Sequence, residues 1–368
     1  MPIEAVELMD LFVLQGCAEN QALVVARRGP DTAVARIDLA HPEIQSFIQF
    51  ADQVEHVVLG GERPTPAQLD AVGTRLFDHI FQGEVLRLYN RVPSPNFSIQ
   101  IATDEPSVQR IPWEFIRPHD RLAVPHRDRC VVRVLPICAP SDPAPTRSLK
   151  KLKVLLAVAD PVDQAGVGWQ DVEYNVRRAF EAQTDGLATL KVIPAATSQA
   201  LLQALDADSY DVFHFLGHGC IVEGEGRLVL VDVATKKSDY ITAEQVAVAL
   251  GGQNLRLVLL SACLTAAGNF KDDFGPVATA LLRNGVPAVV ANQTSIPTKS
   301  VAPFVGALYQ RLLREGNIDS AVMSGRVALQ DALRKAMPPA SAVVEWGIPA
   351  LYRLPGGDQL FVPRGDLQ

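Results

Sequence analysis

The sequence predicts an α/β fold in which a doubly wound, mostly parallel sheet carries helices on both faces, preceded by a smaller α+β region. The first indication is that apolar runs of strand length alternate with helical segments along the second half of the chain. The second is that polar residues rarely interrupt these runs, as strands covered on both faces require. The third is length, because 368 residues are too many for one small core.

A stretch rich in proline and serine, PICAPSDPAPTRSLKK at 136–151, predicts an exposed linker. We therefore expect an N-terminal α+β region over residues 1–135 and the α/β domain over residues 152–368. The sequence on either side of the linker shows no repeat of fixed period, which argues against a solenoid.

The N-terminal region is expected to contain a helix over 65–81. Thr65 suits its N-cap and Pro66 its first position, and apolar residues recur on one face at Leu69, Val72, Leu76 and Ile80. Strands are expected at 22–28, 32–39, 96–103 and 129–136. Between the last two strands, Trp113 and Phe115 are expected to be buried anchors.

The α/β domain is expected to alternate regularly between strands and helices. Its strands are expected at 153–159, 188–195, 210–217, 255–262 and 286–292. Its helices are expected at 169–183, 197–207, 242–250 and 274–284, with a long helical stretch at 298–335. Thr242 and Gln245 have the spacing of a capping box at the start of the third helix.

Charge and cysteine content exclude several classes of protein. The 34 basic against 41 acidic residues give a net charge of -7, which argues against direct binding of nucleic acid. We expect no membrane span, because no uncharged apolar run is long enough, and no signal peptide, because the first residues carry acids. Five scattered cysteines do not indicate a disulfide framework, so we expect the cytoplasm, where thiols stay reduced.

The first strand of the α/β domain is followed by a loop without a phosphate-binding motif. The sequence AVADPVDQAG at 157–166 matches neither G-x-G-x-x-G nor a P-loop. A nucleotide-binding α/β protein is therefore disfavoured, and we expect no cofactor.

Chemically reactive residues occur where two of the predicted strands end. His218 and Cys220 follow the strand at 210–217, and Cys263 follows the strand at 255–262. Ligands of doubly wound sheets bind at the carboxyl ends of the strands, and consecutive strands are usually neighbours. We therefore expect His218 and Cys263 to lie side by side.

A histidine beside a cysteine is the minimum set for catalysis by a thiol, since the imidazole takes the thiol proton and later protonates the leaving group. Gly217 and Gly219 are expected to form a tight turn that directs His218 outward. The backbone N–H groups of Gly219 and Cys263 then supply an oxyanion hole. The expected substrate-binding residues are Ser261, Ala262, Asn292 and Gln293.

Histidine and cysteine side chains in this region also admit other roles. His214 is expected to be a buried core histidine, and Cys220 either a small buried apolar residue or a bystander near the site. A zinc site made of His214, His218, Cys220 and Cys263 is disfavoured, because His214 and His218 are not expected to share one face of the strand. We therefore expect no metal.

Several motifs in order resemble the CHAT domain family. They are HFLGHG at 214–219, LLSACLTA at 259–266, LLRNGVPAVVAN at 281–292 and the late Trp346. IPWEFIRP and RCVVRVLP resemble the segment that precedes the catalytic half in that family, so the resemblance covers about residue 90 to the end, with 90–135 as the associated segment.

The resemblance implies a caspase-like fold and a cysteine protease related to separases, gingipains, legumains and metacaspases. It assigns His218 as the catalytic histidine, Cys263 as the nucleophile and the backbone of Gly219 to the oxyanion hole, without a third acid. It also implies an endopeptidase that cleaves a specific protein partner in a bacterial conflict, antiphage defence or cell-death system. A catalytically silent scaffold that binds a partner through the same crevice is the alternative.

Two further expectations concern specificity and control. The resemblance implies that the residue two positions before the nucleophile helps to line the pocket for the side chain before the cut, and here it is Ser261, small and neutral. Because 291–297 offers no charge either, an uncharged residue such as Leu or Met is expected before the cut. The loops at 220–227 and 265–275 are expected to be mobile until an activating partner or sensor protein, or proteolytic clipping, orders them.

Overall fold

The structure is a computed structural model that divides into two compact units. It describes residues 8–16, 18, 20–58, 60–91, 96–102, 105–119, 125, 129–134, 146–148, 151–164, 166–182, 186, 188–223, 225–251, 253–262, 275–294, 296 and 298–362. The first unit comprises Met1–Pro140 and Leu333–Gly347, and the second comprises Ser141–Ala332 and Ile348–Gln368. The first boundary falls inside the stretch expected to be a linker, whereas the return of Leu333–Gly347 to the first unit was not anticipated.

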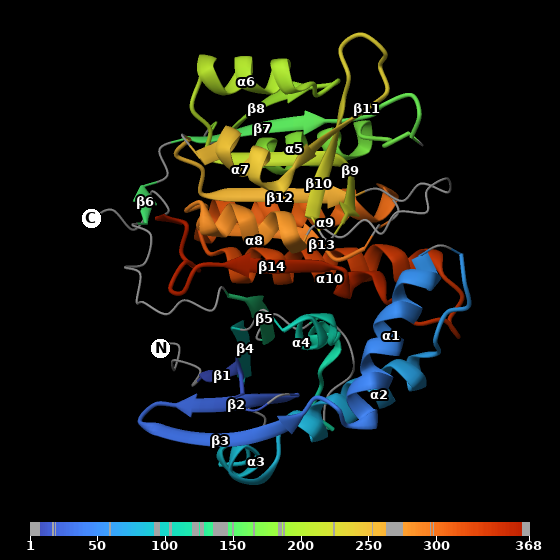
Figure 1. The fold of residues 1–368 in the computed structure, drawn as a ribbon, viewed down its shortest axis with the longest axis vertical. Helices are drawn as coiled ribbons and strands as arrows, with labels where there is room; N and C mark the ends of the chain where they lie inside the picture. Colours follow the sequence, from blue (N-terminus) through green and yellow to red (C-terminus); the bar gives the residue numbers. More distant parts are fainter. Residues whose placement is uncertain are drawn as a thin grey trace. The chain divides into compact units, whose positions relative to one another are not determined.

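The strands of the first unit are hydrogen-bonded in the order β5-β4-β1-β2-β3 (Figure 1). They are β1 Leu8–Gln15, β2 Gln21–Arg28, β3 Asp31–Asp38, β4 Asn96–Ala102 and β5 Arg129–Arg133. β2 pairs antiparallel with β1 and β3, while β4 pairs parallel with β1 and β5. The four strands predicted for this region are confirmed, and β1 is an additional one.

Helices of the first unit follow the signals that their sequences carry. They are α1 Pro42–Val58, α2 Pro66–Ile80, α3 Gly83–Tyr89, α4 Pro106–Arg110 and the 3-10 turns η1 Trp113–Phe115 and η2 Glu345–Gly347. The predicted start of α2 is confirmed: the Gln68 N–H donates to Thr65 Oγ1 over 3.2 Å, and the Thr65 N–H donates to Gln68 Oε1 over 2.8 Å. The predicted apolar stripe of α2 is buried.

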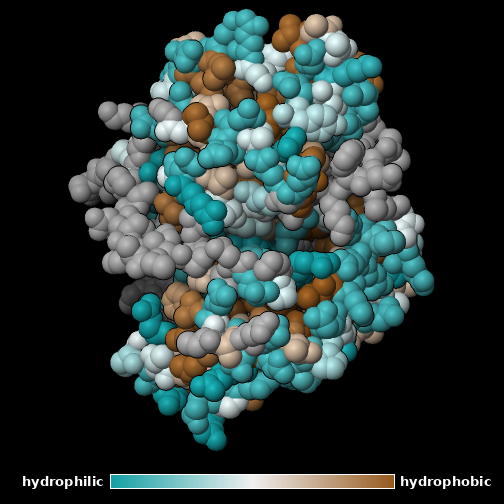
Figure 2. Space-filling view, viewed as in Figure 1, coloured by the Kyte–Doolittle hydropathy of each residue, from teal (hydrophilic) through white to brown (hydrophobic). Residues whose placement is uncertain are grey.

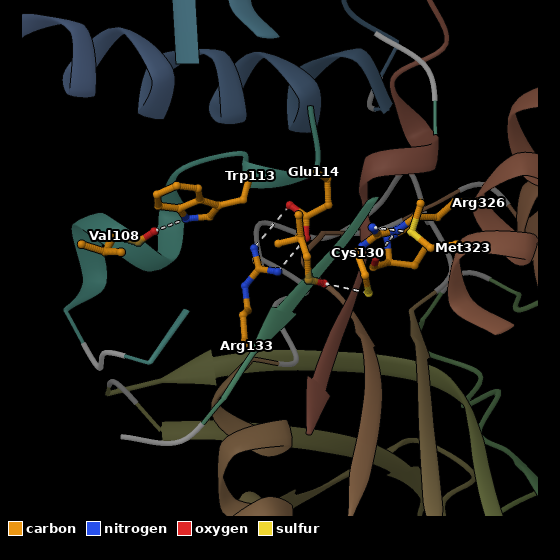
Figure 3. A network of polar contacts seen from close by, with 9 residues as sticks. Val108, Trp113, Glu114, Cys130, Arg133, Met323 and Arg326 are labelled. Atoms are coloured by element: carbon orange, nitrogen blue, oxygen red, sulfur yellow. Dashed lines mark hydrogen bonds and ion pairs between the residues drawn. The ribbon is translucent and has the colours of Figure 1, made fainter. Parts of the chain in front are cut away.

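The motif IPWEFIRP lies in the core of the first unit. Trp113 and Phe115 are confirmed as buried, and the indole N–H of Trp113 donates to the Val108 carbonyl over 2.8 Å (Figure 3). Between them, Glu114 accepts hydrogen bonds of 2.6 and 3.4 Å from the Arg133 guanidinium. Both charged side chains are almost completely buried, so this ion pair is part of the core.

The second unit has the predicted doubly wound sheet. The hydrogen-bonded order is β8-β7-β9-β12-β13-β14, parallel except for β14, which pairs antiparallel with β13. The strands are β7 Leu152–Val158, β8 Ala188–Ile193, β9 Val212–Val222, β12 Leu257–Ala262, β13 Ala288–Asn292 and β14 Pro349–Arg353. β10 Glu225–Val231 and β11 Ser238–Thr242 form a hairpin on the end of β9, and β6 Arg147–Ser148 pairs with β15 Phe361–Val362.

Helices cover both faces of this sheet, as predicted. They are α5 Gln170–Glu181, α6 Ser198–Ala207, α7 Ala243–Gly251, α8 Gly275–Arg283, α9 Thr298–Glu315 and α10 Ile318–Ala336. α7 and α8 pack together in front of the sheet in Figure 1, and α5 packs against α9 behind it. The capping box predicted at Thr242 and Gln245 is present at the start of α7.

Hydrophilic residues cover most of the described surface in Figure 2, with hydrophobic patches between them. The most exposed large apolar side chains are those of Val162 and Val248, each 71% exposed. Within the part of the chain that the structure describes, none of the helices combines the length and the apolar character needed to cross a bilayer.

Candidate active site

Strand β9 is longer than predicted, which corrects the expected turn at Gly217 and Gly219. Both glycines lie within β9, which continues to Val222. Gly217 is required for space, because a Cβ there would lie 2.7 Å from the Phe215 ring and 3.1 Å from Ala159. The expected loop at 220–227 is likewise mostly strand, since its ends belong to β9 and β10.

β9 changes its pairing partners at His218. Before this point the strand is parallel to two neighbours, with Leu216 opposite Val158 of β7 and Gly217 opposite Ala262 of β12. From His218 onward it pairs antiparallel with β10. His218 is therefore the first residue beyond the carboxyl edge of the parallel sheet, and its side chain is buried at 3% exposure.

The β9–β10 hairpin determines the direction of the Gly219 amide. The pair Val222–Glu225 closes a two-residue turn, in which Glu223 has a φ of 54°. Such a closing pair is hydrogen-bonded, and hydrogen-bonded and non-hydrogen-bonded pairs alternate along an antiparallel ladder. Gly219, opposite Leu228, is therefore a non-hydrogen-bonded position, whose N–H points away from β10.

Hydrogen bonds at the edge of the sheet give the same direction independently. The Ala159 N–H donates to the Leu216 carbonyl over 2.9 Å, so residues of even number in β9 direct their backbone groups toward the β7 edge. β10 lies on that edge too, since Ala196 is hydrogen-bonded to both Val231 and Val158. The N–H of Gly219, at an odd position, therefore faces the edge at which β9 pairs with β12.

Cys263 lies outside the residues that the structure describes. The last described residue of β12 is Ala262, which is opposite Gly217 and therefore next to the position of His218. The structure thus brings the end of β12 beside His218, and the placement of the thiol stays a prediction.

His214 is confirmed as a core histidine, because its side chain is completely buried. Its Nε2 lies 3.4 Å from the Ser261 hydroxyl and its Nδ1 lies 3.4 Å from the Tyr309 hydroxyl. Burial lowers the pKa of His214 to about 3 and raises the pKa of Tyr309. The imidazole is therefore neutral near pH 7.

The expected substrate-binding residues lie along one edge of the sheet. Ser261 pairs with Leu216, and the register of β12 with β13 brings Asn292 level with Ser261. Both side chains are buried, and Gln293 follows with its N–H donating to the Ile348 carbonyl over 3.1 Å. Because the Ser261 hydroxyl contacts His214, this side chain supports β12 from the interior. The side chain of Ala262 lies outside the described residues.

One argument against zinc was wrong. His214 and His218 are four residues apart on one strand, and side chains at even spacing share a face of a strand. Cys220, also in β9, is buried. Among the residues that the structure describes, however, no three His, Cys, Asp or Glu side chains form a group that could hold a metal ion.

Sequence reasoning missed two features of the site, one beside His218 and one beside His214. The first is β10, which places Val229 opposite His218 and brings Gly226 against the start of α8. A Cβ on Gly226 would lie 2.9 Å from Pro276. The run RLVLV after EGEG was a usable hairpin signal. The second feature is Tyr309, which no local pattern distinguishes from any other buried aromatic residue of a helix.

Comparisons with known proteins identify one family model. A model described as "CHAT domain" matches residues 70–352. Among solved structures, the Saccharomyces cerevisiae separase–securin complex aligns with a TM-score of 0.46 and 11% sequence identity. That alignment covers 96% of this chain and 30% of the other chain, so this chain spans less than a third of the length of the chain that it matches. Curated proteins yield no match.

Proposed function

The chain belongs to the CHAT family of caspase-like proteases, and we propose that it is a cysteine endopeptidase using His218 and Cys263. The observation that carries the proposal is the register of β9 and β12, in which Ala262 is opposite Gly217. Cys263 follows Ala262, and His218 follows Gly217. Because consecutive Cα atoms are about 3.8 Å apart, each of the two residues is one step away from a member of this pair, which supports their being close together.

In the proposed reaction the His218 imidazole accepts the proton of the Cys263 thiol, and Sγ attacks the carbonyl carbon of the scissile peptide bond. The negative charge develops on the carbonyl oxygen. In the proposal, the N–H of Gly219, which is directed toward the β12 edge, donates a hydrogen bond to this oxygen and stabilises the charge. As the intermediate collapses, the imidazolium returns the proton to the leaving amine. Water then hydrolyses the thioester and restores the thiol.

The proposed specificity is for an uncharged residue, such as Leu or Met, before the cut. Support comes from Asn292 at the end of β13, whose amide side chain brings no charge to this edge of the sheet, while the Ser261 hydroxyl faces His214. An ionised substrate side chain would lose its hydration there without compensation. Positional peptide libraries test this point, and a dominant Arg or Asp before the cut would contradict it.

The proposed role is cleavage of a specific protein partner in the cytoplasm, within a bacterial conflict, antiphage defence or cell-death system. Family membership supports the reaction class, while the partner and the setting come from resemblance. The proposed control is that an activating partner assembles the site through residues 265–275, nearly all of which lie outside the described residues.

The test is incubation of the purified chain with the proteins encoded beside its gene, followed by gel electrophoresis and mass spectrometry. Cleavage of one protein by the wild type, and by neither Cys263→Ala nor His218→Ala, is the expected result. Cys220→Ala is the matched control and retains activity. Binding of a partner without cleavage, unchanged in Cys263→Ala, would establish the silent scaffold instead.

A further inference from the structure

We infer that Tyr309, His214 and Ser261 form a buried polar chain that positions the end of β12 against His218. The inference rests on the proposed pairing of His218 with Cys263. The three residues are positioning residues, because they act on the thiol through the strand that carries it.

The three side chains come from three separate elements of the second unit. Tyr309 belongs to α9, His214 to β9 and Ser261 to β12. Each hydroxyl lies 3.4 Å from one of the two ring nitrogens of His214. His214 and Tyr309 are fully buried, and Ser261 is 7% exposed. The imidazole therefore joins two strands and a helix through polar contacts inside the core of the second unit.

The chemistry of the three groups is complementary. Since burial keeps the imidazole neutral, one ring nitrogen donates a hydrogen bond and the other accepts one. A hydroxyl can do either, so Ser261 and Tyr309 satisfy both tautomers of His214. A buried polar group without a partner is unfavourable, which means that any arrangement separating these three groups is disfavoured.

The position of the buried polar chain in the sheet determines which part of the site it holds in place. Ser261 is the second-last described residue of β12, and its neighbour in β9 is Leu216, two residues from both His214 and His218. Apolar side chains alone would tolerate small shifts between the two strands. A polar contact across them favours a single register, and that register sets the distance between the strand end and His218.

Tyr309, the member of the buried polar chain that lies on α9, is fixed as well. The Tyr309 ring contacts the Phe180 ring of α5 edge-on, with centroids 5.5 Å apart at 85°. α9 comes close to α5 at Gly306, where a Cβ would lie 3.6 Å from Asn175. The hydroxyl of Tyr309 is thus held by helix packing that does not depend on β12.

The test measures alkylation of Cys263 by iodoacetamide at pH 7, with peptide mass spectrometry separating it from the other four cysteines. Ser261→Val and Ser261→Thr add the same volume, and only threonine keeps the hydroxyl. We expect Ser261→Val and Tyr309→Phe to slow alkylation about tenfold or more, because small misplacements at a reacting group have effects of that order. Ser261→Thr is expected to restore most of the wild-type rate.

Two further variants separate positioning from general destabilisation. Leu201→Ala removes a buried side chain of α6, lowering the melting temperature while leaving alkylation at the wild-type rate. His218→Ala sets the slow limit for a thiol without its imidazole. Equal rates for Ser261→Val and Ser261→Thr, or a Leu201→Ala variant as slow as Tyr309→Phe, would overturn the inference.

Failure of the proposed function gives a different result. Alkylation needs neither a substrate nor turnover, so the series is informative even where the wild type cleaves no protein. If His218→Ala alkylates at the wild-type rate, the pairing of His218 with Cys263 fails and the inference fails with it. If His218→Ala is slow while Ser261→Val matches Ser261→Thr, only the positioning role is refuted.

Discussion

Acidification is expected to destabilise the second unit through His214. Burial holds the pKa of this imidazole at about 3, against 6.5 for the unperturbed group. The unfolded chain therefore binds the proton more tightly than the folded chain does, and protonation favours unfolding. The stabilisation is complete above pH 6.5 and is lost progressively as the pH falls from 6.5 toward 3.

The magnitude follows from the separation of the two pKa values. Inside this window, each unit by which the pH falls lowers the free energy of unfolding by about 1.4 kcal/mol. Lowering the pH from 6.5 to 5 therefore lowers the free energy of unfolding by about 2 kcal/mol. Because domains are typically stable by about 5–15 kcal/mol, this loss is a substantial fraction of the whole.

The assay is urea unfolding followed by circular dichroism at pH 7 and pH 5, on the wild type and on His214→Gln. The glutamine amide also donates and accepts hydrogen bonds but does not titrate. Burial and the neighbouring His41 lower the pKa of His79 as well, but that group titrates in both proteins and cancels in the comparison. The expected excess loss in the wild type is about 2 kcal/mol, and equal losses in the two proteins would refute the reasoning.

Three other predictions concern stability and are measured by urea unfolding at pH 7. Glu114→Ala leaves the Arg133 guanidinium buried without its carboxylate and is expected to lower the free energy of unfolding by about 3–5 kcal/mol. A decrease below about 1 kcal/mol would show that the pair behaves as a surface salt bridge. Gly217→Ala introduces a Cβ 2.7 Å from a ring carbon and is expected to cost about 1–3 kcal/mol. Gly251→Ala, where no heavy atom lies within 4 Å of the added Cβ, is its control and should be nearly neutral. Thr65→Ala removes the N-cap of α2 at an expected cost of about 1 kcal/mol, and no change would mean that water replaces the cap.

The elements that sequence reasoning predicted well are those whose signals are local. The helix over 65–81 was predicted because its cap, its first proline and its apolar stripe all lie within one segment. The parallel strands were predicted because burial on both faces requires uninterrupted apolar runs. α1, which the sequence analysis does not predict, carries the same kind of stripe, with Ile44, Phe47 and Ile48 buried.

The features that were missed depend on pairing between distant segments. The glycines at 217 and 219 were interpreted as a turn, but β9 continues because β10 supplies new hydrogen-bonding partners beyond the sheet edge. Similarly, the residues expected at the site include Ser261 but not Tyr309, which is 95 residues from His214 along the chain. The hairpin signal of β10 shows that a strand follows but not that β9 continues to meet it, and the contact with α9 leaves no pattern in the adjacent sequence.

The division of the first unit between two segments of the chain has a consequence for the order of events during synthesis. Arg63 is paired with Glu345, and the Phe115 ring contacts the Trp346 ring at 4.8 Å, so the early part of the unit depends on residues translated near the end. Domains usually fold as units, the N-terminal one first, while the ribosome is still at work. Here the parallel strands β7 to β13 leave the ribosome before Trp346 does. The N-terminal unit therefore completes its core only after most strands of the second unit's sheet have been synthesised, shortly before β14 completes that sheet.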